Sequence, residues 1–353
     1  MSGLRSIASG LYRGEVSLDI VGRARLWYAI SLVVIGVAIF GVFGKGFNLG
    51  IEFRGGAEFQ VSVSEDSVSK GRQIVQEAGI ENPIVTQLGT GTLRIQTLAL
   101  TDEETTTIIN ALASGFGVAA SEVQVRIVGP SWGADITRTA VNALLVFLAL
   151  VSIFLALTYE WRMAAGALVA LLHDVLITVG LYALIGFEVT PATAIGFLTI
   201  LGYSLYDTVV VFDKVKENTK NIERQSRFTY TAAANLAVNQ SLIRSVNTSI
   251  VAILPVAGIL FVGAGILGAG TLRDISLALF IGMLVGTYSS LTLATAVLVN
   301  LKERTPEMQA LRRRASNKTT LKSNTLQADV LEEKVVVETG VRKQPRRKPR
   351  SKR

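Results

Sequence analysis

The stretch ATAIGFLTILGYSLYDTVVVF, residues 192–212, carries a single charged side chain, Asp207. About 20 mostly apolar residues is the length that an α-helix needs to cross the hydrocarbon core of a bilayer. An acid inside such a helix costs about 2.5–3.5 kcal/mol on insertion scales, so it usually faces a bundle interior or a water path. The stretch therefore predicts a membrane-spanning helix, and it raises the question of what its acid does.

The composition of the whole chain favours a polytopic α-helical membrane protein. Of its 353 residues, 50% are hydrophobic and 18% are charged, whereas soluble domains carry about 25% charged residues. Asp174 is the only charged residue inside the other apolar runs, which lie at residues 26–44, 139–158, 163–186, 246–268 and 275–299. We expect six transmembrane helices. The first run is too long for the apolar core of a signal peptide and is expected to stay uncleaved.

The distribution of lysine and arginine predicts the orientation of these helices. Cations cluster before the first run, between the fourth and fifth runs, and after the sixth, whereas the two short loops on the other side carry only Arg273. Because lysine and arginine are enriched in cytoplasmic segments, both termini are expected in the cytoplasm. The one large loop then faces outward.

This loop, residues 45–136, is acidic and has the pattern of a small α+β domain. Two helices that open at Ser or Thr with acids in their first turn alternate with four strand-like segments. The order β-α-β-β-α-β is the split pattern of ferredoxin-like folds. We therefore expect a ferredoxin-like extracytoplasmic domain.

The rest of the chain divides into four parts. Residues 1–25 form a cytoplasmic segment, residues 26–44 the first helix and residues 137–300 the other five helices. Residues 301–353 are rich in Lys, Arg, Ser and Thr, and such a segment cannot bury enough apolar surface to order itself. We expect a disordered basic tail near anionic cytoplasmic lipid, with nucleic-acid or ribosome binding as the alternative.

Four polar residues are candidates for work inside the membrane. Asp207 and Asp174 are buried acids, which tend to take up a proton when they are unpaired. His173 precedes Asp174, and Arg244 lies where the fifth helix begins and could reach an acid on a neighbouring helix. An Asp–Arg pair that breaks on protonation would make a proton relay. The alternative reading is that Asp207 is a structural hydrogen-bonding acid and His173 a packing residue.

Other motifs give little support for an enzymatic, metal or cofactor site. The chain has no cysteine and one histidine, which excludes disulfides and multi-histidine metal sites. The glycines at 263, 265 and 268 match a nucleotide-binding pattern, but they end an apolar helix and do not join a strand to a helix. Gly282 and Gly286 are spaced for close helix packing. No phosphate loop, nucleophile elbow or metalloprotease motif is present, so we expect neither an enzyme nor a cofactor.

An ordered set of motifs resembles the SecF family, the smaller of two paired membrane subunits that assist the bacterial Sec protein-export translocase. The motifs are GIEFRGGAEF, VGPSWG, YEWRM, HD, GYSLYDTVVVFDKVKEN and NQSLIRSVNTS. The resemblance covers about residues 20–300. The sequence departs from the family at Tyr206, where Asn is frequent, at Glu52, where Asp is frequent, and at Lys214 and Lys216, where Arg is frequent.

The resemblance implies that the chain is similar to half of an RND-type transporter and pairs with SecD in the bacterial cytoplasmic membrane. It implies an auxiliary role beside the SecYEG translocon and its accessory proteins, in which the proton-motive force promotes export of preproteins. Asp207 and Arg244 match the family's intramembrane acid and base, with an acid of SecD completing the site. Two alternatives stay open: a structural assembly subunit that moves no protons, and half of an RND-type small-molecule exporter.

Overall fold

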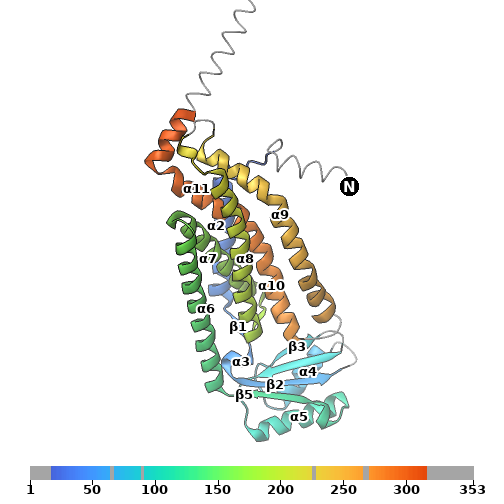
Figure 1. The fold of residues 1–353 in the computed structure, drawn as a ribbon. Coiled ribbons are helices and arrows are strands. Elements are labelled where there is room, and N and C mark those ends of the chain that lie inside the picture. The colour runs from blue at the N-terminus through green and yellow to red at the C-terminus, as the bar shows by residue number, and fades with distance from the viewer. Residues whose placement is uncertain (1–16, 64–66, 89–90, 225–227, 265–269, 316–353) are drawn as a thin grey trace, which may run out of the picture.

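The computed structural model describes residues 17–63, 67–88, 91–224, 228–264 and 270–315, and shows a helical bundle with a small α/β unit at one end (Figure 1). Within this part, six helices are long and apolar enough to cross a membrane. They are Ala24–Lys45, Ser131–Thr158, Trp161–Ile185, Pro191–Arg224, Tyr230–Gly263 and Leu272–Glu303. The six predicted spans are confirmed, and the chain is a multi-pass membrane protein.

Three of these spans change from α-helical to wider π-helical turns. The α-helical parts are α2 (Ala24–Phe40), α6 (Pro130–Thr158), α7 (Trp161–Ile185), α8 (Pro191–Asn218), α9 (Tyr230–Gly258) and α10 (Gly270–Ser289). The π-helical turns are η1 (Gly41–Lys45) after α2, η4 (Ile259–Ala264) after α9 and η5 (Ser290–Ala294) after α10. The last span ends with α11 (Thr295–Glu303). A short 3₁₀ turn, η3 (Ile222–Arg224), follows α8.

The fifth helix starts well before the predicted residue 246. The side chain of Thr229 accepts a hydrogen bond from the Ala232 N–H and caps α9 at its N-terminus. This part of the helix carries Asn235 and Asn239, which bind the segment before α2. Asn239 accepts from the Leu18 N–H at 2.8 Å, and Asn235 accepts from the N–H groups of residues 20 and 21 at 3.0 Å.

The end of the chain also differs from the predicted disordered tail. Residues 301–303 belong to α11, and residues 306–315 form a further helix in which Leu311 is fully buried against the bundle. The apolar spacing of Met308, Leu311 and Ala315 places one face of this helix on the core. Residues 301–315 are therefore ordered. Residues 1–16 and 316–353, with the glycines at 265 and 268, lie outside the described residues.

The α/β unit is a four-stranded antiparallel sheet with two helices. Its elements are β2 (Gly56–Ser62), α4 (Val68–Glu77), β3 (Ile84–Leu88), β4 (Thr92–Thr97), α5 (Asp102–Phe116), η2 (Ala120–Glu122) and β5 (Gln124–Val128). The strands lie in the order β3-β4-β2-β5. Alternate residues such as Phe59 and Ile95 are fully buried in the cluster that also holds Ile108 and Leu112 of α5, so α5 covers that face of the sheet (Figure 1).

Local sequence signals explain where two of the helices, α5 and α6, begin. Thr101 and Glu104 form a reciprocal capping box at the start of α5. The N–H of Thr101 donates to the Glu104 carboxylate, which lowers the pKa of that carboxyl. Pro130 opens α6 two residues after β5 ends, so the second membrane helix begins earlier than the predicted residue 137.

Two short elements connect the unit to the bundle. After α2, β1 (Asn48–Leu49) pairs in parallel with β6 (Glu188–Val189), which lies between α7 and α8. The short helix α3 (Ile51–Arg54) then leads into β2. Two segments that are far apart in the sequence, residues 48–54 and 188–189, therefore meet beside the sheet.

Glycines set how closely the membrane helices approach one another. A Cβ at Gly282 of α10 would lie 2.2 Å from Ile200 Cδ1 on α8, and one at Gly196 of α8 would lie 2.8 Å from Ala278 Cβ on α10. Gly286 is similarly close to Ser204. The spacing of Gly282 and Gly286 thus serves close packing of α8 and α10, as the sequence predicts.

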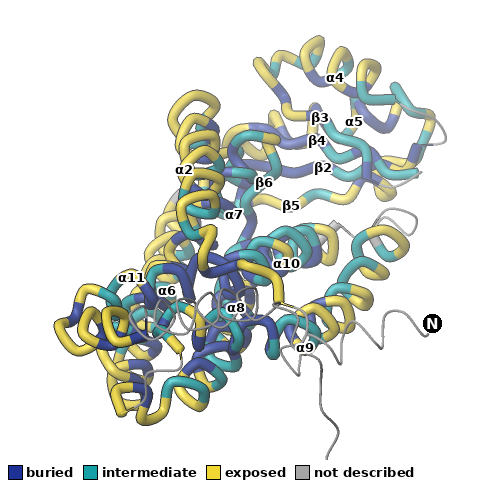
Figure 2. Tube along the Cα trace, turned by 90° about the horizontal axis from the view of Figure 1, so that it is seen from above, coloured by how far each residue is buried: buried dark blue, intermediate teal, exposed yellow. Residues whose placement is uncertain are grey.

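Figure 2 shows buried positions along α7, α8 and α10, whereas α2 is largely exposed.

The contact between α2 and α7 gives a direct test of this packing. A Cβ at Gly180 would lie 2.2 Å from Ala38 Cβ and 2.5 Å from its Cα, so Gly180→Ala forces the two backbones apart. We expect it to lower stability by about 1–3 kcal/mol, measured as a lower thermal unfolding midpoint of the purified protein in detergent. Gly202→Ala is the control, because an added Cβ there meets nothing within 4 Å. Equal midpoints for the two variants would contradict this account.

Candidate functional site

Asp174 lies in the centre of the bundle and is 1% exposed. Its Oδ2 accepts hydrogen bonds from Ser204 Oγ of α8 at 2.5 Å and from Ser289 Oγ of α10 at 2.8 Å. These two bonds join α7 to both neighbouring helices. A buried carboxyl group is tolerated when such donors replace water.

His173 completes the surroundings of Asp174. Its Nδ1 lies 3.0 Å from Asp174 Oδ1, and its ring packs against Tyr288 with centroids 6.0 Å apart. The ring is 2% exposed, and its Nε2 has no hydrogen-bond partner among the described residues. His173 therefore has one nitrogen beside the acid and the other available for a proton or a water molecule.

Asp207 lies one turn beyond Ser204 on the same face of α8 and is 3% exposed. Its Oδ2 accepts a hydrogen bond from Ser290 Oγ at 2.5 Å. The neighbouring Tyr206 is 52% exposed. The residue that departs from the family pattern thus lies largely outside the buried site.

Two consecutive serines connect the two acids. Ser289 ends α10 and binds Asp174, and Ser290 begins the π-helical η5 and binds Asp207. Such π-helical turns inside α-helices occur frequently at functional sites. We name the set Asp174, Ser204, Asp207, Ser289 and Ser290 the acid–serine network.

The close approach of α8 and α10 is necessary for this network. A Cβ at Gly286 would lie 3.0 Å from Ser204 Cβ, so the glycine lets Ser204 sit against α10 and still reach Asp174. The sequence alone did not predict Ser289 and Ser290 as part of the site. The available signal was the run of hydroxyl side chains in TYSSLT, residues 287–292, inside an otherwise apolar span.

Arg244 is not brought to either acid. It lies on an exposed face of α9, and none of the ion pairs between described residues includes it. α9 instead meets the site through Ser249, whose Oγ lies 3.1 Å from Tyr203 Oη and 2.7 Å from Thr287 Oγ1. The predicted Asp207–Arg244 pair is therefore not formed in this conformation of the isolated chain.

A second polar cluster, which we call the junction, connects the four-stranded sheet to the membrane helices. Arg94 of β4 forms an ion pair with Glu188 of β6. Gln96 Nε2 donates to Glu188 Oε1 at 2.7 Å and to Glu58 Oε2 at 3.0 Å. A polar cavity of about 280 Å³ lies among these residues. The sequence alone did not predict that Glu188 connects the sheet to the membrane helices.

The junction connects directly to the helix that carries Asp207. Thr190, two residues after Glu188, caps α8, and its Oγ1 donates to Asp274 Oδ2 of α10 at 3.1 Å. The start of α8 is therefore fixed to the outer sheet and to α10. Glu52, at another position that departs from the family, pairs with Arg126 of β5 at 3.0 Å.

The acid–serine network combines hydroxyl donors with two buried carboxyl acceptors. In the described part of the chain, no group of three or more His, Asp or Glu side chains is placed to hold a metal ion.

Comparison with known sequences relates the chain to protein export. Residues 108–304 match the family described as Protein export membrane protein SecD/SecF, C-terminal, and residues 40–66 match the SecD/SecF GG motif. The chain is 49% identical to the Protein translocase subunit SecF of Streptomyces coelicolor, over 89% of this chain and 84% of that protein. It is 42% identical to the SecF of Mycobacterium tuberculosis, over 86% and 71%.

Comparison with solved structures also relates the chain to the SecD/SecF proteins. The crystal structure of SecDF from Thermus thermophilus, described as a translocon-associated membrane protein, superposes with a TM-score of 0.73 at 33% identity. A structure of SecDF in a super-membrane-facing form superposes with a TM-score of 0.59 at 30% identity. The match covers 82% and 86% of this chain, but only 39% and 40% of the SecDF chains.

The junction yields a prediction about stability. The side chains of Arg94 and Glu188 are 12% and 8% exposed, so Arg94→Met leaves Glu188 nearly buried without its cation. We expect a loss of about 3 kcal/mol, seen as a lower unfolding midpoint and faster hydrogen exchange in β4 and the first turn of α8. Arg312→Met, at a pair whose arginine is 72% exposed, should change neither. If hydrogen exchange in Arg94→Met were as slow as in the wild type, the junction would not hold the sheet.

Proposed function

The chain belongs to the SecD/SecF family of protein-export membrane proteins, and from this premise we propose that it is an auxiliary subunit of a Sec protein translocase. It works with a SecD-type partner and uses the proton-motive force to promote export of proteins across the cytoplasmic membrane of a bacterium. The observation that carries the proposal is the acid–serine network, in which two buried acids accept hydrogen bonds from separate hydroxyl donors at the contact of three membrane helices.

The first step is proton binding at Asp207. In the described part of the chain, neither Asp207 nor Asp174 has a lysine or arginine partner. A buried carboxylate without a cation is strongly disfavoured relative to the protonated acid. In the described conformation Asp207 has a hydroxyl donor, Ser290, and no cation. In the mechanism that we propose, proton exchange switches Asp207 between this state and a second state, in which its carboxylate faces a cation.

Arg244 is the cation that we assign to this second state. It lies on α9, and only 6% of the residues in the most apolar part of this span are buried within the chain. The corresponding shares are 50% for α7 and 56% for the last span. A partner that covers α9 would remove Arg244 from lipid and direct it toward an acid. We propose that an acid of the SecD-type partner completes the site, and that Asp174 and His173 form a weaker second station for the proton.

The second step is movement of α8. Asp207 lies 16 residues after the start of α8 at Pro191, which is about 24 Å along the helix axis. Breaking or forming the Ser290–Asp207 bond changes how α8 sits on α10. Because Thr190 and Glu188 join the start of α8 to the outer sheet, this change is transmitted to the junction.

The outer unit receives the movement. We infer that residues 56–128 form a ferredoxin-like domain on the extracytoplasmic side, supported by the strand order β3-β4-β2-β5 and by two helices that alternate with the strands. Both termini are then cytoplasmic, which agrees with the distribution of Lys and Arg. There the domain would contact exported chains as they leave the SecYEG channel and its accessory proteins. No enzymatic step or cofactor is part of this proposal.

One observation favours a second candidate function. The faces of α2, α6 and α9 expose many large apolar side chains, among them Leu32, Leu157 and Val251. A subunit that only held translocon partners together would also need such surfaces. That scaffold would tolerate loss of the charge at Asp207, whereas a proton-coupled subunit would not.

An export assay separates the two functions. Asp207→Asn cannot ionise, so it should fix one state, while the chain still folds and binds its partner. With ATP saturating, wild-type vesicles should export a secreted protein faster when a proton gradient is imposed, since each charge gains about 2.3 kcal/mol per 100 mV. Asp207→Asn should lose this gain. Arg244→Met should lose it too, and the double variant should be little worse than either.

Asp135→Asn is the control, because Asp135 is an exposed acid on α6 outside the network. It should keep the full gain. If Asp207→Asn kept the full gain at normal abundance, Asp207 would not be the coupling acid and the scaffold would be favoured.

A further inference from the structure

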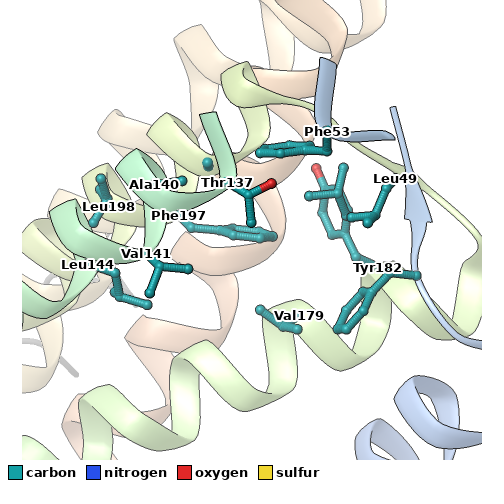
Figure 3. Close-up of a pocket in the computed structure, with 13 residues that line it drawn as sticks. Leu49, Phe53, Thr137, Ala140, Val141, Leu144, Val179, Tyr182, Phe197 and Leu198 are labelled. Carbon is teal, nitrogen blue, oxygen red and sulfur yellow. The ribbon is translucent and has the colours of Figure 1, made fainter. Parts of the chain in front are cut away.

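An apolar pocket of about 410 Å³ lies at the outer end of the membrane helices, apart from the acid–serine network and the junction. Figure 3 shows side chains from α6, α7 and α8 around one space beside Leu49 and Phe53. Only two lining residues carry a polar side-chain group, Thr137 and Tyr182. Thr137 Oγ1 donates to Gly133 O at 2.9 Å, and Tyr182 Oη donates to Asp274 O at 3.2 Å. Both hydroxyls are thus already engaged, and the pocket offers an apolar ligand nothing but hydrocarbon contacts.

The depth of the pocket limits what can enter it. Arg138 is exposed on α6 directly before the apolar run of residues 139–158, so it is expected at the interface with water. Val141, which lines the pocket, lies about 4–5 Å further along the helix. Half the hydrocarbon core is about 15 Å thick. The pocket therefore lies within one leaflet, the one nearest the α/β unit, where its neighbours are lipid chains or other helices.

The size of the pocket selects between these two occupants. A helix with its side chains is about 10–12 Å across, too wide to enter a cavity of about 410 Å³. A single extended hydrocarbon chain is narrow enough to lie along α6 between α7 and α8. The apolar lining would replace its contacts with neighbouring lipid tails.

Charges beside the pocket indicate the headgroup. Lys45, Arg54 and Arg138 are exposed, and each lies within two residues of a lining residue. None of the three forms an ion pair with a described residue: Lys45 donates to Leu184 O and Arg54 to Phe47 O, both at 2.8 Å. Three acids also lie within two residues of a lining residue. Glu52 pairs with Arg126 and Glu188 with Arg94, whereas Asp135 has no ion pair with a described residue. An anionic phosphate at the interface would therefore find three cations and one unpaired acid.

We propose that this pocket binds one acyl chain of an anionic phospholipid, with the phosphate beside Lys45, Arg54 and Arg138. The bound chain would fill the space between α6 and the contact of α7 with α8. It would also fix Phe47 and Phe53, which lie on the connection from α2 to the outer sheet. The site does not depend on proton coupling and would exist in a scaffold as well.

Native mass spectrometry of the full chain, purified in a mild detergent, tests the site. We expect one retained phospholipid, with phosphatidylglycerol preferred over phosphatidylcholine at least tenfold when both are supplied in equal amounts. Ala140→Phe fills the pocket and should reduce retention at least tenfold. Ala143→Phe is the matched control, because it adds the same ring to an exposed position on the same helix outside the pocket. Lys45→Gln combined with Arg138→Gln should retain a lipid but lose the headgroup preference.

A diazirine-bearing aliphatic amino acid at Val179 gives an independent readout that does not require Ala140→Phe to fold. Val179 lines the pocket, so irradiation of native membranes should attach a phospholipid to it. Attachment to a polypeptide would overturn the proposal in favour of a protein segment in the pocket. Equal retention by Ala140→Phe and Ala143→Phe, or equal binding of the two phospholipids by the wild type, would overturn it as well.

Discussion

Two carboxyl groups inside a membrane bundle must find hydrogen-bond donors within the protein, since lipid offers none. The rest of this structure depends on how that requirement is met. Ser204 and Ser289 donate to Asp174, and Ser290 donates to Asp207. These bonds fix the relative positions of α7, α8 and α10, because a slide by one turn would separate each serine from its acid. The glycines on α8 and α10 allow the close approach that the short serine side chains need.

The same arrangement connects chemistry in the membrane to geometry outside it. α8 carries Asp207 in its middle and begins at the junction, where Glu188 binds Arg94 and Gln96 of the outer sheet. In the mechanism that we propose, a proton changes one hydrogen bond at Asp207, and α8, which is anchored at its far end, transmits this change to the sheet. We also propose that Arg244, on the exposed α9, acts together with a second subunit.

The sequence predicted the parts of this protein that depend on local pattern. Apolar length predicted six spans, and alternation with capping residues predicted the order of elements in the outer unit. Asp174 and Asp207 stood out because charge inside an apolar run is costly. The pattern failed where a distant contact decides the structure. The part of α9 before residue 246 was not predicted because it lies outside the apolar run, and its Asn235 and Asn239 bind a segment more than 200 residues away. Leu311 packs on a core that the sequence of the tail does not reveal. Ser289, Ser290 and Glu188 were missed because only their positions in space give them partners.

The central claim is that Asp207 takes up and releases a proton in the working complex, and infrared difference spectroscopy observes this directly. Membranes that contain the chain with its partner would be stepped between low and high pH on the outer side, and the carboxyl stretching region recorded. A protonated-carboxyl band should appear at low pH in the wild type and be absent from Asp207→Asn, while Ser290→Ala should shift its frequency because the hydrogen bond is lost. An unchanged band in Asp207→Asn would show that another group binds the proton and would contradict the account.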